Sequence, residues 1–321
     1  PRAEVRLHDW GVLSLLLHRA VAHRVRDASS HVVAALLGTL VGCLDEAVQW
    51  VTPARYFGLR DIGINAFASA LAQVGLAMGV RPSGIARRFE PAGVRAVCRA
   101  ALAVWVLLLA FALNTPERVA VWAPRVPGLG FLVSNESTMM EYGHRYEDPD
   151  IGVFRSRLAP DELAREDARR FAEAARTVDA YRDAYGQFLL DVPPQRDAFV
   201  HELRVHLFRR DRYLEFHLAQ PSETPADVVE RRKLATVVAR EDRLVRRYFP
   251  RTFAASGYAL PEELQQRIED DELPDLAYES TVSADLVTQV REGHVLLGFG
   301  LVFAALVAVE LRARAAEATR P

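Results

Sequence analysis

Seven polar side chains in the first 65 residues have types and spacing that could form a site beside a membrane. His8 comes first, and six more follow between Gly42 and Leu71: Asp45, Glu46, Gln49, Arg55, Asp61 and Asn65. A carboxylate can act as a base or hold a cation, and an arginine can hold an anionic head group such as a phosphate. Histidine is a candidate proton carrier near neutral pH. Asp45 or Glu46 would then be the base or cation site, with the amides and Asp61 orienting these groups.

The spacing places these residues at the tip of a helical hairpin. Asp45 and Glu46 close one apolar helix, and Pro53 ends it. The turn is short enough for Arg55 to reach Glu46 or Asp61 in a charge-assisted pair. Asp61 opens the next helix, where an aspartate commonly caps free N–H groups.

Two interpretations of this cluster follow. It can be a capped, salt-bridged turn, with Asn65 hydrogen-bonded between helices. It can also be a functional site, because ionisable groups at membrane depth cost about 2.5–3.5 kcal/mol each and are functional by default. The number of polar groups exceeds what a cap requires.

Apolar runs flank the cluster and recur near the end of the chain. A spanning helix needs about 20 mostly apolar residues, with a range of roughly 17–25. Three runs meet that length and two are shorter: Asp61–Val80, Val97–Leu113 and Val295–Leu311, then His31–Leu44 and Leu7–Val21. Core helices of a water-soluble protein are the alternative, but so many runs are hard to bury in one such fold. The sequence predicts an all-α, polytopic membrane protein.

Arginines predict the orientation of these helices, because short basic loops stay in the cytoplasm. Loops 18–31 and 81–99 and the tail after Glu310 carry eleven of them. The polar cluster and residues 114–292 are therefore expected outside, and the C-terminus inside, the cytoplasmic membrane. The first visible helix would start outside, so we expect a further helix upstream of Pro1.

Residues 114–292 are rich in charge and read as an extracytoplasmic helical insert between the membrane domain 1–113 and the final segment 293–321. Residues 114–150 look irregular and no strand is expected. Apolar stripes at helical spacing predict three amphipathic helices: one over 160–192, one along 199–218 that ends at Pro221, and one along 229–248. A small helical bundle follows. Both cysteines, Cys43 and Cys98, lie in apolar runs and are expected to pack as small hydrophobic side chains.

The segment HELRVH, from His201 to His206, resembles a zinc-protease helix but has the wrong spacing. That chemistry needs histidines at i and i+4, whereas His206 lies about 140° around the helix from His201. Glu202, His206 and His217 are instead expected to form a solvated polar edge. We predict no metal and no cofactor, and a net charge of -2 argues against nucleic acid as a partner.

The stretch LDEAVQWVTPARYFGLRDIGINAFAS resembles the VanZ-like family of bacterial membrane proteins. The resemblance rests on an acid pair and Gln that end one helix, Pro and Arg in the turn, and Asp and Asn that open the next. The upstream RLHDWGVLSLLLHRA, with His8, resembles the family's preceding helix. Residues 4–80 carry the likeness, and the insert and last helix lie outside the minimal family.

The resemblance implies a cell-envelope protein associated with resistance to glycopeptides of the teicoplanin type, and it supplies no established reaction. The first hypothesis is an outward-facing site that binds or modifies a membrane lipid or lipid-linked envelope precursor, or a lipophilic drug; whether it is an enzyme stays open. The alternative is a non-enzymatic scaffold or sensor whose residues 114–292 bind an envelope protein. A transporter is weaker, because no inverted repeat is visible.

Overall fold

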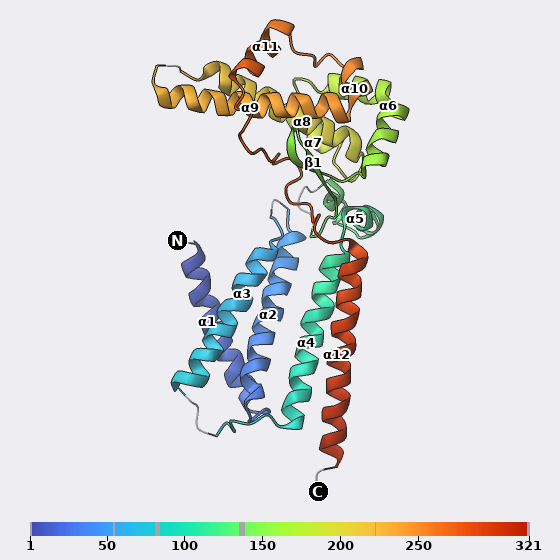
Figure 1. Ribbon diagram of the computed structural model, residues 1–321. Coiled ribbons are helices and arrows are strands. Elements are labelled where there is room, and N and C mark those ends of the chain that lie inside the picture. Colours follow the sequence, from blue (N-terminus) through green and yellow to red (C-terminus); the bar gives the residue numbers. More distant parts are fainter. Residues whose placement is uncertain (1, 54, 81–83, 135–138, 222, 320–321) are drawn as a thin grey trace. The chain divides into compact units, whose positions relative to one another are not determined.

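Two compact units make up the chain (Figure 1). The computed structural model describes residues 2–53, 55–80, 84–134, 139–221 and 223–319, without the side chains of residues 2–9 and 134. Unit 1 is Pro1–Val119, Ser137–Met140 and Glu292–Pro321, and unit 2 is Ala120–Glu136 and Glu141–Arg291. The structure is 70% helical, which confirms the prediction of a mainly helical protein.

Unit 1 is built from long apolar helices. They are α1 (Arg2–Ala22), α2 (Ser29–Trp50), α3 (Leu59–Gly75) with the π-helical turn η1 (Leu76–Val80), α4 (Pro91–Leu113) and α12 (Glu292–Ala318). Within the described residues, four segments are long and apolar enough to cross a membrane: 29–50, 59–80, 91–113 and 292–318. In α1 the apolar part is shorter, Trp10–Ala22. The chain therefore has the helices of a membrane protein.

Helix α2 lies at the centre of unit 1, where it packs against α1, α3 and α4, while α12 packs on α4. The α4–α12 pair is held by the indole N–H of Trp105, which donates to the carbonyl oxygen of Phe299 at 2.9 Å. An ion pair joins Arg99 to Glu310 at 2.8 Å. Two helices far apart in sequence thus form one antiparallel pair.

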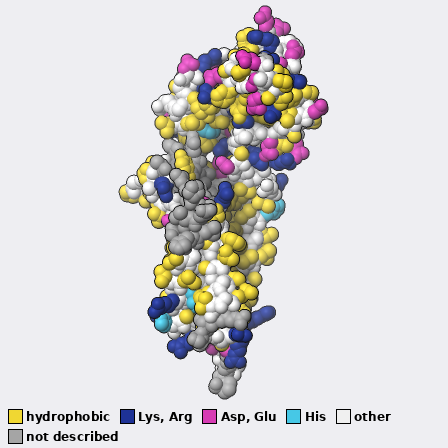
Figure 2. Space-filling model, turned by 90° about the vertical axis from the view of Figure 1, so that its left-hand side faces the viewer, with side chains coloured by type: hydrophobic (Ala, Val, Ile, Leu, Met, Phe, Trp, Pro, Cys, Tyr) yellow, Lys and Arg dark blue, Asp and Glu magenta, His cyan; other side chains and the backbone are white. Residues whose placement is uncertain are grey.

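The polar cluster and the basic loops lie at opposite ends of the unit 1 helices. At one end the ring of Phe57, in the α2–α3 turn, packs edge-on against Phe111 near the end of α4. At the other end the α1–α2 and α3–α4 loops meet, because the N–H of Ala86 donates to the carbonyl of Arg26 at 2.8 Å. On the face drawn in Figure 2, basic side chains gather at this second end, below a largely hydrophobic surface.

Unit 2 is helical apart from one hairpin, which the sequence analysis did not predict. Strands β1 (His144–Asp148) and β2 (Gly152–Ser156) pair antiparallel, with His144 opposite Ser156. The other elements are α5 (Pro116–Trp122, which begins in unit 1), η2 (Ala123–Arg125), η3 (Gly130–Ser134), α6 (Pro160–Ala180), α7 (Tyr185–Asp191), α8 (Ala198–Ala219), α9 (Pro225–Tyr248), α10 (Pro250–Ala255) and α11 (Glu262–Asp271). The single helix predicted over 160–192 is two, because the chain turns at 181–184 between α6 and α7.

The core of unit 2 forms where α8 and α9 pack together, with aromatic and aliphatic side chains from β2, α6 and α7 around them. Local sequence fixes both helix starts. Asp197 caps α8 by accepting from the N–H of Val200, and Thr224 with Asp227 forms a capping box on α9.

The polar residues of the HELRVH segment are buried, so the expected solvated edge is wrong. His201, Glu202, His206 and His217 are all less than a tenth exposed. His206 Nδ1 lies 2.6 Å from Glu241 on α9, and Glu202 accepts from the hydroxyl of Ser156 at 2.5 Å. Partners from distant elements let these groups leave water.

Glu241 is the centre of this buried polar network. Besides His206, its carboxylate accepts hydrogen bonds from the hydroxyls of Tyr278 at 2.5 Å and Ser280 at 2.7 Å, and pairs with Arg209 at 3.1 Å. Burial acts to raise the pKa of Glu241, but His206 and the two hydroxyl donors outweigh it and hold that pKa below its usual range. The network therefore keeps a charged carboxylate inside the unit.

Candidate functional site

The α2–α3 turn brings four of the predicted residues into one hydrogen-bonded chain. Gln49 is its centre, because its side-chain NH2 donates to Asp45 at 2.8 Å and to Glu46 at 3.3 Å. These contacts follow from helical spacing, since residues three and four apart share a face. The carbonyl oxygen of Gln49 in turn accepts from Arg55 Nη2 at 3.2 Å.

Arg55 thus bonds to the Gln49 amide through its Nη2. The guanidinium is exposed to solvent. Its charge therefore stays available to an incoming anion.

Glu46 and Asp45 are adjacent in sequence but differ in environment. Glu46 is 1% exposed, and its Oε2 accepts from the backbone N–H of Gly58 at 2.9 Å. Asp45 is exposed. Glu46 consequently holds the turn in place, whereas Asp45 offers its carboxylate to the surroundings.

Asp61 lies beside this chain in the first turn of α3, and Gly58 takes the N-cap position that the sequence suggested for it. Helix α3 begins at Leu59 with Gly58 at the N-cap, so Asp61 is the third helical residue. A Cβ placed on Gly58 would lie 3.5 Å from Asp61 Oδ2, which locates this carboxylate close to the residue that binds Glu46. A carboxylate in the first turn is favoured by the helix dipole.

Asn65 lies one turn further along α3, against α2. A Cβ on Gly42 would be 3.1 Å from the Asn65 Cβ, so glycine at 42 permits the two helices to approach closely. Asn65 is 2% exposed, and within the described part of the chain its Oδ1 has no hydrogen-bond partner. The side chain of His8 lies outside the described residues.

The polar face of α3 continues away from the turn, which the sequence analysis missed. Asp61, Asn65, Ser69 and Gln73 recur every four residues, so they share one face of the helix. Gln73 Nε2 donates to the backbone oxygen of Ser14 on α1 at 2.8 Å, and Ser14 Oγ donates to the carbonyl of Ser69 at 3.1 Å. The four-residue spacing was the available signal.

Near the other end of these helices, His31 Nδ1 lies 3.2 Å from Gln73 Oε1. Buried polar groups that bond across helices fix their mutual register. The face of α3 thus joins α1, α2 and α3 into one support for the turn.

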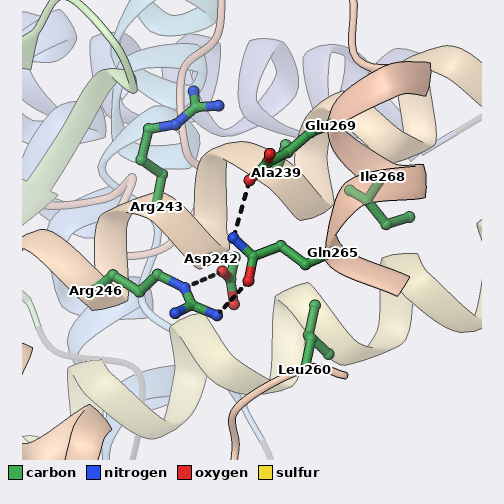
Figure 3. Close-up of a pocket in the computed structure, with 8 residues that line it drawn as sticks. All are labelled: Ala239, Asp242, Arg243, Arg246, Leu260, Gln265, Ile268 and Glu269. Atoms are coloured by element: carbon green, nitrogen blue, oxygen red, sulfur yellow. Dashed lines mark hydrogen bonds and ion pairs between the residues drawn. The ribbon is translucent and has the colours of Figure 1, made fainter. Parts of the chain in front are cut away.

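A pocket in unit 2, drawn in Figure 3, is a competing candidate site. It lies between α9 and α11, and its polar groups bond to one another: Arg246 pairs with Asp242 at 2.5 Å and donates to Gln265 at 3.0 Å. Gln265 then donates to Glu269 at 3.0 Å. Because these groups already bond to one another, we interpret the pocket as a packed junction between two helices.

The charges of the α2–α3 turn suit recognition more than metal binding. Three carboxylates stand near one guanidinium, and within the described residues no group of three or more His, Cys, Asp or Glu could hold a metal ion. An exposed Arg55 and an exposed Asp45, both held by Gln49, can contact opposite charges of a zwitterionic group.

Comparison with known proteins yields no match to a family model, to a curated protein or to a solved structure.

Proposed function

We propose that this chain is a VanZ-like cell-envelope protein whose α2–α3 turn binds a lipid-linked envelope precursor or a lipophilic glycopeptide of the teicoplanin type. One observation supports this most: Arg55, Gln49, Asp45 and Glu46, the residues of the resemblance, form a single hydrogen-bonded chain.

The side chains divide into two roles. Arg55 holds an anionic group such as a phosphate, and Asp45 meets a cationic group of the same ligand. Glu46, Asp61 and Asn65 position the turn from the helix ends. We assign binding to this site and no reaction.

The same proposal gives the location. The chain lies in the bacterial cytoplasmic membrane with the α2–α3 turn and residues 114–292 outside and the C-terminus in the cytoplasm. The arginines at the α1–α2 and α3–α4 loops support this orientation through the excess of basic residues expected on the cytoplasmic side.

The test is teicoplanin susceptibility of a bacterium that lacks its own copy and expresses the full chain. Arg55→Ala and Asp45→Asn are compared with Arg60→Ala, which removes an exposed arginine from the first turn of α3. Protection by the wild type and by Arg60→Ala, but not by the two site variants at equal membrane abundance, is the expected result. Equal protection by all variants would overturn the proposal.

A second candidate function, a scaffold, is favoured by exposed apolar side chains where α8 ends and α9 begins. These are Phe216, Leu218, Val228 and Val229, each at least 36% exposed. Such clustering is typical of a protein-binding surface. Under this second hypothesis unit 2 binds an envelope protein, and the membrane helices anchor unit 2.

Deleting 120–291 separates the two functions. Arg118 Nη1 and Glu292 Oε1 lie 2.6 Å apart, so a short Gly/Ser linker can join the two ends without straining unit 1. Retained protection supports the turn as the site. Lost protection at normal abundance supports the scaffold, and Leu218→Ser should then also abolish it, whereas Leu190→Ser, on an exposed residue of α7, should not.

A further inference from the structure

A second pocket opens at the basic end of unit 1, away from the α2–α3 turn. It has a volume of about 410 Å³ and is lined by His18, Arg19, Ala22, His23, Arg26 and the 84–85 segment. The guanidinium groups of Arg19 and Arg26 come from the last turn of α1 and from the loop that follows it. Apolar Ala22 and Ile85 lie between them and complete the lining.

The positive charge of this pocket is not neutralised by the acids nearby. Arg19, His23 and Arg26 are exposed and pair with no acidic side chain among the described residues. Asp27 is 4% exposed and uses both carboxylate oxygens on backbone N–H groups, those of Ser29 at 2.7 Å and Glu90 at 3.1 Å. The local acid therefore holds the loops and leaves the arginines unpaired.

The inner wall of the pocket contains a buried histidine. His18 is 5% exposed and stacks on His31 with ring centroids 4.4 Å apart. Both ring nitrogens of His18 lack a hydrogen-bond partner within the described structure. A buried polar group without a partner is unfavourable, and a ligand that reaches this wall would supply one.

The pocket is preformed, because the two loops that frame it are joined. Besides the Asp27 contacts, the N–H of Ala86 donates to the carbonyl of Arg26 at 2.8 Å. Glycine at position 93 lets α4 approach, since a Cβ there would lie 2.4 Å from Asp27 Oδ2. Little ordering of the backbone at residues 26–27 and 84–90 is left for a ligand to impose.

We propose that this pocket binds a phosphate-bearing anion, which is either the head group of an anionic phospholipid or a phosphorylated solute. Guanidinium groups recognise phosphate through paired, charge-assisted hydrogen bonds. The apolar residues between the arginines suit the glycerol or acyl part of such a molecule. This inference does not rest on the function proposed for the α2–α3 turn.

The experiment titrates the detergent-solubilised full chain by calorimetry at constant ionic strength. The probes are dioctanoyl phosphatidylglycerol, dioctanoyl phosphatidylcholine and inorganic phosphate. Arg24→Gln is the matched control for Arg19→Gln and Arg26→Gln, because Arg24 is an exposed arginine of the same loop that does not line the pocket. Thermal unfolding of each variant verifies that unit 1 is intact.

Saturable binding that weakens about tenfold in Arg19→Gln and in Arg26→Gln, and less than twofold in Arg24→Gln, is the expected result, since one charged hydrogen bond is worth about that factor. Binding of phosphatidylglycerol alone identifies a lipid head group as the ligand. Binding of inorganic phosphate as well identifies a phosphorylated solute. No binding, or equal losses in all three variants, overturns the proposal and leaves the arginines as signals for membrane orientation.

Discussion

The carboxylate of Glu46 and the backbone N–H of Gly58 lie 2.9 Å apart across the α2–α3 turn. This contact ties the end of one apolar helix to the start of the next. Because Glu46 is buried, the turn takes this carboxylate out of water, and the N–H of Gly58 and the side-chain amide of Gln49 donate to it.

Replacing Glu46 by Gln should therefore destabilise the protein by about 1–3 kcal/mol, since an NH2 group would face one of the two donors. The control is Asp45→Asn, at an exposed position, which we expect to change stability by less than about 0.5 kcal/mol. Reversible denaturation of the full chain in detergent micelles measures both. Equal values for the two variants would show that the contact does not hold the turn.

Gly38→Ala tests the close approach of α2 and α3. A Cβ at residue 38 would lie 2.4 Å from Ser69 Oγ, and such overpacking costs about 1–3 kcal/mol. Gly63→Ala is the matched change on α3, where nothing lies within 4 Å, and the higher helix propensity of alanine should leave it neutral or slightly stabilising. The midpoint of thermal unfolding in detergent distinguishes them. If Ser69→Gly restores the midpoint of Gly38→Ala, the clash lies between these two residues. If it does not, the strain lies elsewhere.

Glu241→Ala should cost unit 2 about 3–5 kcal/mol, because it removes the carboxylate that pairs with buried His206 and half-buried Arg209. Glu215 pairs with Arg212 at 2.7 Å on the surface, and Glu215→Ala should cost about 1 kcal/mol or less. Denaturant unfolding followed by circular dichroism provides the comparison. A small effect at residue 241 would mean that the buried network does not contribute to stability.

His201 should make unit 2 less stable in mild acid. Burial lowers the pKa of His201 to about 4, although the contact of Nδ1 with the carbonyl of Val192 at 2.8 Å acts to raise it. The folded state therefore binds fewer protons than the unfolded state, whose histidine titrates near 6.5. The stability that neutral His201 contributes is complete above pH 6.5. It is lost as the pH falls toward 4, by up to about 3 kcal/mol.

His201→Gln provides the comparison for this pH dependence, because the amide can still donate to Val192 and does not titrate. As the pH falls from 6.5 to 4, the wild type should lose more stability than His201→Gln. Thermal unfolding of both proteins across that range measures it, and parallel pH profiles would contradict the assignment.

The apolar helices could be predicted because about 20 uncharged residues in a row leave few alternatives. The hairpin could not, since its strands have five residues each and are stabilised by contacts that lie far away in sequence. Tyr146 and Phe154 stack on each other at 4.5 Å, and Asp148 binds Arg247, 99 residues later. The burial of His206 was missed for the same reason, because Glu241 supplies its partner from another helix.

At the candidate site, Asp45 and Glu46 lie four and three residues before Gln49, a spacing that puts all three on one helix face. The role of Gly58 was not visible, because a backbone N–H contributes no residue type and is placed by the path of the turn. The partner of Arg55 depended on that path too. The residue types and their spacing therefore predicted a polar cluster, but they did not predict which of its groups bond to one another.

The pairing of α4 with α12 has a consequence for biosynthesis. Trp105 and Phe299 are 194 residues apart, so at about 5–20 residues per second a ribosome needs on the order of 10–40 s between them. During that interval α4 has no α12 to pack against, and unit 2 is synthesised and can fold first. A chaperone or insertion factor that shields the waiting face of α4 would then raise the yield of the protein without contacting the finished fold.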